Sequence, residues 1–293
     1  MKRVKRIAAW AAWGGVLMGL GLSGCESFER NPNLRLLKSR WRDDYDLMYP
    51  VWADNGRIYY LCRYSEGDTI SFGHRFLCGK AFMSISQDGT HDTLLLGDTV
   101  YWENPSPGRF LALSYHKSTG RIAILQVEGP ILIWDIWRDS IIDSVANPNH
   151  LGPIIRWLPD GSGLLVGLDS VWVISVGDSI YTFYGTGSQQ GFEVNPDGTL
   201  YTEVYWPSFC PEDSSVLIWN NWGGSVILSN YSLFIRTSYG DEDLNAGPYE
   251  KSWFYHFVSW SPDGRDLVFA AGEVAGDPLM EGSLELWILE GVR

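Results

Sequence analysis

The stretch that decides the fold is "WSPDGRDLVF" at residues 260–269, close to the C-terminus. Pro presets φ near −65° and Gly accepts a positive φ, so Pro262-Asp263-Gly264 predicts a tight turn between two short apolar strands. Four related stretches precede it in the chain. They are Trp52-Ala53-Asp54-Asn55-Gly56, Asn104-Pro105-Ser106-Pro107-Gly108, Trp157-Leu158-Pro159-Asp160-Gly161 and Phe209-Cys210-Pro211-Glu212-Asp213.

The spacing of these turns indicates an internal repeat. The position held by Gly264 recurs at 56, 108, 161 and 213, so the spacings are 52, 53, 52 and 51 residues. Periods near 50 are typical of propellers. The runs after the turns, such as "RIYYLC" at 57–62 and "RFLALS" at 109–114, have the β-branched and aromatic bias of strands. Second hairpins are predicted at 82–96, 132–145 and 171–184. One unit is therefore about four strands, which is one propeller blade.

This pattern resembles the WD-like repeat of the TolB-type β-propeller. Residues 153–185 and 257–289 fit it closely, and the resemblance covers about 50–293. The units at 104–108 and 209–213 depart from it, because they lack the Trp and the Asp-Gly pair. The chain also has no room for the N-terminal α/β domain that TolB carries. The resemblance implies an all-β propeller of five, or six, four-stranded blades, and only weakly a partner.

The two ends of the chain are expected to join. The last unit stops just after the apolar run "LELWIL" at 284–289, so its outer strand is missing. An unpaired strand edge would then be exposed, which proteins usually avoid. In "NLRLLKS" at 33–39, Leu34 and Leu36 share one face at period two. We predict that residues 33–38 pair with the last blade; the alternative is that they are only a tether.

The N-terminus predicts a bacterial lipoprotein signal peptide at 1–24. A basic start, "MKRVKR", precedes an apolar run from Ile7 to Leu22, which is shorter than a membrane-spanning helix. The ending "LSGC" resembles a lipobox, which implies that Cys25 is lipidated; the alternative is an ordinary signal peptide with a coincidental Cys. Glu26, rather than Asp, after this Cys favours the outer membrane over the inner one. We expect a lipidated tether at 25–32 and a propeller domain at 33–293 that faces the periplasm.

The net charge of the chain limits the classes of partner that it can bind. Without residues 1–24 the chain holds 18 basic and 35 acidic residues, a formal net charge of −17. This balance repels nucleic acid and anionic lipid headgroups, so contact with the membrane is expected through the lipid anchor alone. The expected partners are an envelope protein or cell-wall glycan, and the sequence assigns no oligomeric state.

Three further cysteines have separate interpretations. Cys62 and Cys78 lie 16 residues apart in the first unit, and such a pair can form a disulfide in an oxidising envelope. The alternative is two buried free thiols. Cys210 occupies the repeat position of Ser261 and is predicted to be a small buried residue.

Motifs for catalysis or metal binding are absent from the sequence. No two of the five histidines have zinc-ligand spacing, and no G-x-S-x-G nucleophile elbow occurs in the mature chain. The acidic stretch "SYGDEDLNAG" at 238–247 lacks the Gly and the terminal Glu of an EF-hand and is interpreted as a solvated loop. We therefore expect no cofactor, no metal and no catalytic residue. A propeller enzyme whose polar residues converge from different blades stays an open alternative.

Aromatic residues give the one candidate surface. Trp52, Trp157 and Trp260 are expected to pack between blades. Others lie where strands give way to loops and could provide rigid contact area. These are Tyr205, Trp206, Trp219, Trp222, Tyr249 and Trp253. The favoured function is a lipid-anchored, non-enzymatic protein-interaction or scaffold module of the cell envelope; the alternatives are a glycan- or peptide-binding sensor and the enzyme above.

Overall fold

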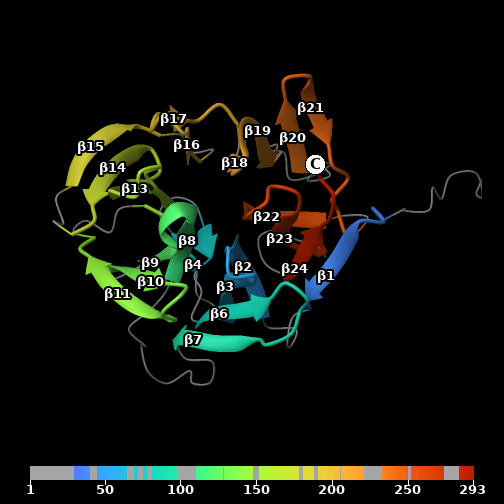
Figure 1. The fold of residues 1–293 in the computed structure, drawn as a ribbon, viewed down its shortest axis with the longest axis horizontal. Coiled ribbons are helices and arrows are strands. Elements are labelled where there is room, and N and C mark those ends of the chain that lie inside the picture. Colours follow the sequence, from blue (N-terminus) through green and yellow to red (C-terminus); the bar gives the residue numbers. More distant parts are fainter. Residues whose placement is uncertain are drawn as a thin grey trace, which may run out of the picture.

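The computed structural model describes residues 30–39, 45–64, 69–71, 75–77, 81–97, 110–127, 129–147, 152–177, 181–187, 191–204, 206–220, 233–249, 252–273 and 284–293. In these residues strands form five four-stranded antiparallel sheets, each of which is one blade of a β-propeller. The predicted all-β fold is therefore confirmed. The blades follow one another in chain order around a ring (Figure 1).

In blades 1 to 4 the four strands follow one another in chain order, with the first strand nearest the axis of the ring and the fourth outermost. Blade 1 is β2 (Tyr45–Trp52), β3 (Arg57–Tyr64), β6 (Ala81–Ser86) and β7 (Thr93–Gly97). Blade 2 is β8 (Phe110–His116), β9 (Arg121–Gln126), β10 (Ile131–Asp135) and β11 (Ser140–Val145). Blade 3 is β12 (Ile154–Trp157), β13 (Gly163–Gly167), β14 (Ser170–Ser175) and β15 (Tyr181–Thr186). Blade 4 is β18 (Ser208–Cys210), β19 (Asp213–Asn220), β20 (Leu233–Thr237) and β21 (Gly240–Asp243).

Blade 5 joins the two ends of the chain. It consists of β22 (Ser252–Trp260), β23 (Leu267–Glu273), β24 (Glu285–Leu289) and, as the outermost strand, β1 (Leu34–Lys38). β1 pairs antiparallel with β24, from Leu34 opposite Leu289 to Lys38 opposite Leu286. The predicted closure of the ring by residues 33–38 is confirmed.

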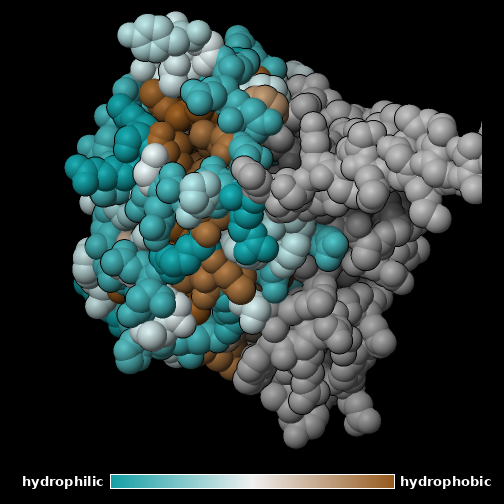
Figure 2. All heavy atoms as spheres, turned by 90° about the vertical axis from the view of Figure 1, so that its right-hand side faces the viewer, coloured by the Kyte–Doolittle hydropathy of each residue, from teal (hydrophilic) through white to brown (hydrophobic). Residues whose placement is uncertain are grey.

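The N-terminal segment is also held by side chains. Arg30 donates from Nε to the carbonyl oxygen of Pro248 at 3.0 Å, and its guanidinium carbon lies 5.2 Å from the ring centroid of Trp287. We call this contact the N-terminal clamp. At the other end of β1, Lys38 forms an ion pair with Asp92, which also accepts a hydrogen bond from Tyr60 at 2.5 Å. Figure 2 faces this rim and shows apolar surface framed by hydrophilic side chains; Leu36 of β1 is 41% exposed.

The repeated tryptophans pack between blades, as predicted. Trp52, Trp157 and Trp260 are 5–6% exposed. The indole N–H of Trp157 donates to the carbonyl oxygen of Ser114 in blade 2 at 3.0 Å, and that of Trp260 donates to Ser208 in blade 4 at 3.1 Å. Trp157 and Trp260 therefore bury their apolar rings and bond their indole N–H to the preceding blade, while Trp52 donates from its backbone N–H to Ser259 Oγ of blade 5 at 3.0 Å.

The turns after these tryptophans bring neighbouring blades close together. Gly161 and Gly264 have φ values of 72° and 68°, as a Pro-Asp-Gly turn requires. A Cβ atom on Gly264 would lie 2.8 Å from Cys210 Sγ in blade 4, and one on Gly161 would lie 2.6 Å from the His116 ring in blade 2. Glycine is thus needed for the close approach as well as for φ. Cys210 is 3% exposed, which confirms its predicted burial.

The repeat of blade 2 lies elsewhere than the spacing predicts. Residues 104–108 are outside the described residues, and "RFLALS" leads into the innermost strand β8 rather than the second strand. The equivalent turn is the 3₁₀ segment η1 (Lys117–Thr119) with Gly120, whose φ is 64°. The prediction was wrong here because "KSTG" has neither the Pro nor the Asp of the other turns.

A small hairpin lies between blades 3 and 4. It consists of β16 (Glu193–Val194) and β17 (Leu200–Tyr201), on either side of a third Pro-Asp-Gly turn, at 196–198 (Figure 1). Glu193 pairs with Arg156 of blade 3, and Tyr201 accepts a hydrogen bond from Arg236 of blade 4 at 2.9 Å. This two-stranded hairpin thus connects blades 3 and 4 through side-chain contacts. A further hairpin, β4 (Thr69–Ser71) and β5 (Arg75–Leu77), extends from blade 1.

Candidate functional site

Three buried aromatic rings meet near the axis of the ring. Tyr49 of β2 lies 4.1 Å from Phe257 of β22 between ring centroids, and Trp206 lies 5.2 Å from the same Phe257. All three side chains are buried. The guanidinium of Arg156 in blade 3 lies 5.9 Å from Phe257 in blade 5. Blades 3 and 5 are not neighbours, so this contact spans the axis. Arg156 in turn donates to Glu193 at 2.8 Å.

The turns lie on one side of the ring. Adjacent strands are antiparallel, so the turns after the first and the third strand of each blade meet at the same end of the sheet. We call this side the turn face. It lies opposite the connections between blades, and it is where the repeated Pro-Asp-Gly turns gather. The exposed parts of this face are therefore held by short, hydrogen-bonded turns.

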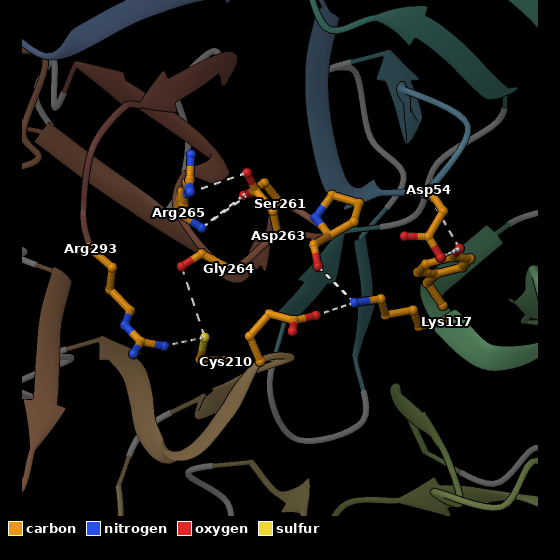
Figure 3. Close-up of polar contacts among 11 residues, drawn as sticks. Asp54, Lys117, Cys210, Ser261, Asp263, Gly264, Arg265 and Arg293 are labelled. Atoms are coloured by element: carbon orange, nitrogen blue, oxygen red, sulfur yellow. Dashed lines mark hydrogen bonds and ion pairs between the residues drawn. The ribbon is translucent and has the colours of Figure 1, made fainter.

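Lys117 crosses the mouth of the channel on the turn face (Figure 3). Its ammonium group donates to the carbonyl oxygen of Pro262 in blade 5 at 2.8 Å and forms an ion pair with Glu212 in blade 4. The two charged side chains are 42% and 51% exposed, so the pair is open to solvent. Beside them, Tyr115 of blade 2 donates to the Asp54 carboxylate of blade 1 at 2.9 Å. Burial raises the pKa of Tyr115, which keeps this donor neutral.

The C-terminal residue completes this polar network. Arg293 donates to Cys210 Sγ at 3.3 Å and to the Asp213 carboxylate at 3.0 Å (Figure 3). In the neighbouring turn, Ser261 donates to Asp263 at 2.6 Å, and this hydrogen bond lowers the pKa of the Asp263 carboxyl. The charges around the channel mouth are therefore held by fixed hydrogen bonds before any partner arrives. This arrangement can present both signs of charge to another protein.

Two large aromatic side chains stand out on the turn face. Trp137 is 66% exposed in the outer turn of blade 2, and Tyr239 is 99% exposed in the outer turn of blade 4. The backbone N–H of Trp137 donates to the Asp135 carboxylate at 2.9 Å, and a Cβ atom on Gly120 would meet its indole ring at 2.4 Å. The side chain of Trp137 is thus exposed to solvent, while its backbone is hydrogen-bonded within the turn and its ring contacts Gly120. These two residues carry no signal in the sequence, because a single aromatic residue in a hairpin turn belongs to no repeat or motif.

The predicted aromatic surface does not come together in the described residues. Trp206 lies at the axis and is 6% exposed, so it is a packing residue. Trp219 stacks on Phe234 within blade 4 at 4.7 Å, and Tyr249 contacts the N-terminal clamp. Tyr205 and Trp222 lie outside the described residues, as does the side chain of Trp253 in β22. Binding by these six residues stays a prediction.

The cysteine and metal predictions have different outcomes. Cys62 is buried without a disulfide partner among the described residues, and burial raises its pKa to about 12; Cys78 and Cys25 lie outside them, so the disulfide and the lipidation stay predictions. The acidic residues predicted as a loop instead form strand β21, which pairs with β20. Asp241 of this strand also forms an ion pair with Arg236 at 2.7 Å. Within the described part of the chain, no group of three potential metal ligands occurs.

Comparisons with known proteins add little to this picture. No family model and no curated protein matches the chain, so the TolB-type resemblance stays an expectation. One solved structure, titled "Crystal Structure of Mitotic Checkpoint Complex", contains a chain that is 14% identical. The match covers 90% of this chain and 93% of that one, with a TM-score of 0.43. No helix in the described ranges is long and apolar enough to cross a membrane.

Proposed function

We propose that the protein is a lipid-anchored β-propeller of the bacterial cell envelope that binds another envelope protein through its turn face. The observation that carries this proposal is the exposure of two aromatic side chains, Trp137 and Tyr239, in the outer turns of blades 2 and 4, on the same face as the charged contacts of Lys117. Aromatic anchors beside pre-positioned charges are the features that dominate protein interfaces. The buried rings of Tyr49, Trp206 and Phe257 occupy space near the axis, which favours binding on the face over a reaction within the channel.

The proposed anchor would hold the ring close to the membrane. Five steps of chain separate Cys25 from Arg30, so the two Cα atoms can be no more than about 18 Å apart. The N-terminal clamp fixes Arg30 beside Pro248 and Trp287. The rim of blade 5 would therefore face the lipid surface, and the turn face would stand beside it rather than against it.

The test is capture of partners from chemically cross-linked, detergent-solubilised envelope. We expect the wild-type protein to retain a partner that the double variant Trp137→Ala/Tyr239→Ala loses. The matched control is Ile141→Ala, which removes an apolar side chain that is 42% exposed on the outer strand of blade 2. Equal capture by the double variant and the wild type would contradict a turn-face site. Loss of capture after enzymatic digestion of the cell wall would instead point to glycan.

A further inference from the structure

The outer edge of blade 3 differs from the edges of the other blades. β15 is the last strand of its sheet, and no strand in the described residues pairs with its outer side. Its sequence, "YTFYGT", has no charged residue. Every other outermost strand carries a charge or directly follows one. These charges are Asp92 before β7, Asp143 in β11, Asp241, Glu242 and Asp243 in β21, and Arg35 and Lys38 in β1.

The exposed residues of β15 are aromatic. Tyr181, Phe183 and Tyr184 are 44%, 52% and 40% exposed. Trp172 of β14 lies 5.5 Å from Phe183 and 6.2 Å from Tyr181 between ring centroids, in edge-to-face contact with both. Three rings thus form one patch beside a row of backbone groups that no described strand pairs with. Natural proteins usually block such edges with charges, because an uncharged edge can accept another strand.

The charge around this edge points to the chemistry of its partner. From residue 157 to 235 the chain contains no Lys, Arg or His, although it holds eight acidic residues. Two of these, Asp169 and Asp197, are exposed at the end of the strand: Gly187 donates from its backbone N–H to the Asp169 carbonyl, and Tyr184 bonds to the carbonyl of Gly198. The hydrogen bonds from Thr199 lower the pKa of Asp197, so its carboxylate stays ionised.

We propose that β15 is a docking edge for an extended, basic segment of a partner protein, which adds to blade 3 as a fifth strand. This inference rests on the proposed function as an interaction module and names the chemistry of one partner. Backbone hydrogen bonds to the edge provide the affinity in this mode of binding, and pockets for alternate side chains provide the specificity. Apolar residues of the segment would lie on the patch of Trp172, Tyr181 and Phe183, and basic residues would meet Asp169 and Asp197.

A second copy of the chain fits this edge less well. It would place the acidic residues of its own blade 3 against those of the first copy, and each copy carries a formal net charge of −13. Like charges placed together at an interface are unfavourable, and they select against the wrong partner. A basic segment is instead attracted by the negative potential of these acidic residues.

The experiment measures binding of synthetic strand peptides to the full-length protein in detergent. The probes are Lys-Thr-Val-Tyr-Val-Thr-Val-Lys, its analogue with Glu at both ends and its analogue with Gln at both ends. We expect the Lys peptide to bind at least about tenfold more tightly than the Glu peptide at low salt, with the difference shrinking as salt rises. The variant Asp169→Asn/Asp197→Asn should weaken binding of the Lys peptide and leave that of the Gln peptide unchanged. Asn at 197 can still accept the turn hydrogen bonds.

Two further variants locate the site. Phe183→Lys places a charge on the edge and should reduce binding of the Lys peptide by at least about tenfold. Ile141→Lys, the matched change on β11, should not alter it. Failure of the Lys peptide to bind, equal binding by Phe183→Lys, or a dimer that Phe183→Lys dissociates in sedimentation would each overturn the proposal. The double variant Trp137→Ala/Tyr239→Ala should still bind the Lys peptide, because the docking edge does not involve the turn face. The two proposals can therefore fail independently.

Discussion

Single side chains connect the blades, and Trp260 shows how. Its ring is 5% exposed, and its indole N–H bonds to Ser208 of the preceding blade. We expect Trp260→Ala to lower the free energy of unfolding by about 3–5 kcal/mol, measured by urea denaturation, because a large cavity opens between two sheets. The control Trp137→Ala, at an exposed turn, should change it by less than about 0.5 kcal/mol. A loss below 1 kcal/mol for Trp260→Ala would show that the ring is not a packing residue.

Lys117, unlike Trp260, should contribute little to the free energy of unfolding. Its contacts with Glu212 and Pro262 cross the channel mouth, but the ion pair is exposed to solvent. Exposed pairs contribute about 0–1 kcal/mol, so Lys117→Met should leave the unfolding free energy within about 1 kcal/mol of the wild type. A double-mutant cycle with Glu212→Gln measures the pair itself. A coupling above about 2 kcal/mol would mean that the bridge holds the ring together.

The sequence reveals the packing residues at this scale but not the channel residues. Trp52, Trp157, Trp260 and Cys210 could be placed because each has a counterpart one repeat away. Trp206 could not, because an aromatic residue before Pro207 looks like a loop tip. Its burial depends on Phe257, which contacts both Trp206 and Tyr49 and does so only after the ring has closed.

At the scale of elements, β1 has the largest predicted effect. Deletion of residues 30–39 removes the outer strand of blade 5, the Lys38–Asp92 ion pair and the N-terminal clamp. We expect a fall in melting temperature of at least about 10 °C, since each 1 kcal/mol shifts it by about 2–4 °C at this size. Limited proteolysis should then cut within 252–293 first. A truncated protein that melts like the full-length one would assign this segment to the tether.

Elements with a turn signature were predictable, and the others were not. The hairpins at 82–96, 132–145 and 171–184 are present in the structure as predicted. The hairpin β16–β17 contains the turn sequence Pro196-Asp197-Gly198, but this turn falls outside the period of about 50 residues, so the repeat does not predict it. The turn of blade 2 has no such signal, because a 3₁₀ segment replaces the Pro-Asp pair.

For the whole molecule, the lipid anchor is the prediction to test first. Cys25→Ser removes the thiol that the signal peptide presents for lipidation. We expect the variant to leave the membrane fraction, or to keep its signal peptide, because several acyl chains are needed for stable attachment. The measurements are membrane fractionation and intact mass. Unchanged fractionation together with unchanged mass would contradict the anchor.

The closing strand also decides how the molecule bears mechanical load. Leu34 pairs with Leu289, so both ends of the chain leave blade 5 at the same end of the β1–β24 ladder. A force that draws the two ends apart therefore opens this ladder one pair at a time, like a zipper. A force between the N-terminus and Glu285, at the opposite end of β24, instead loads the whole ladder in shear. Single-molecule pulling should show a lower rupture force in the first geometry than in the second. A propeller tethered by its N-terminus thus resists tension along β1 and yields when its own ends are separated.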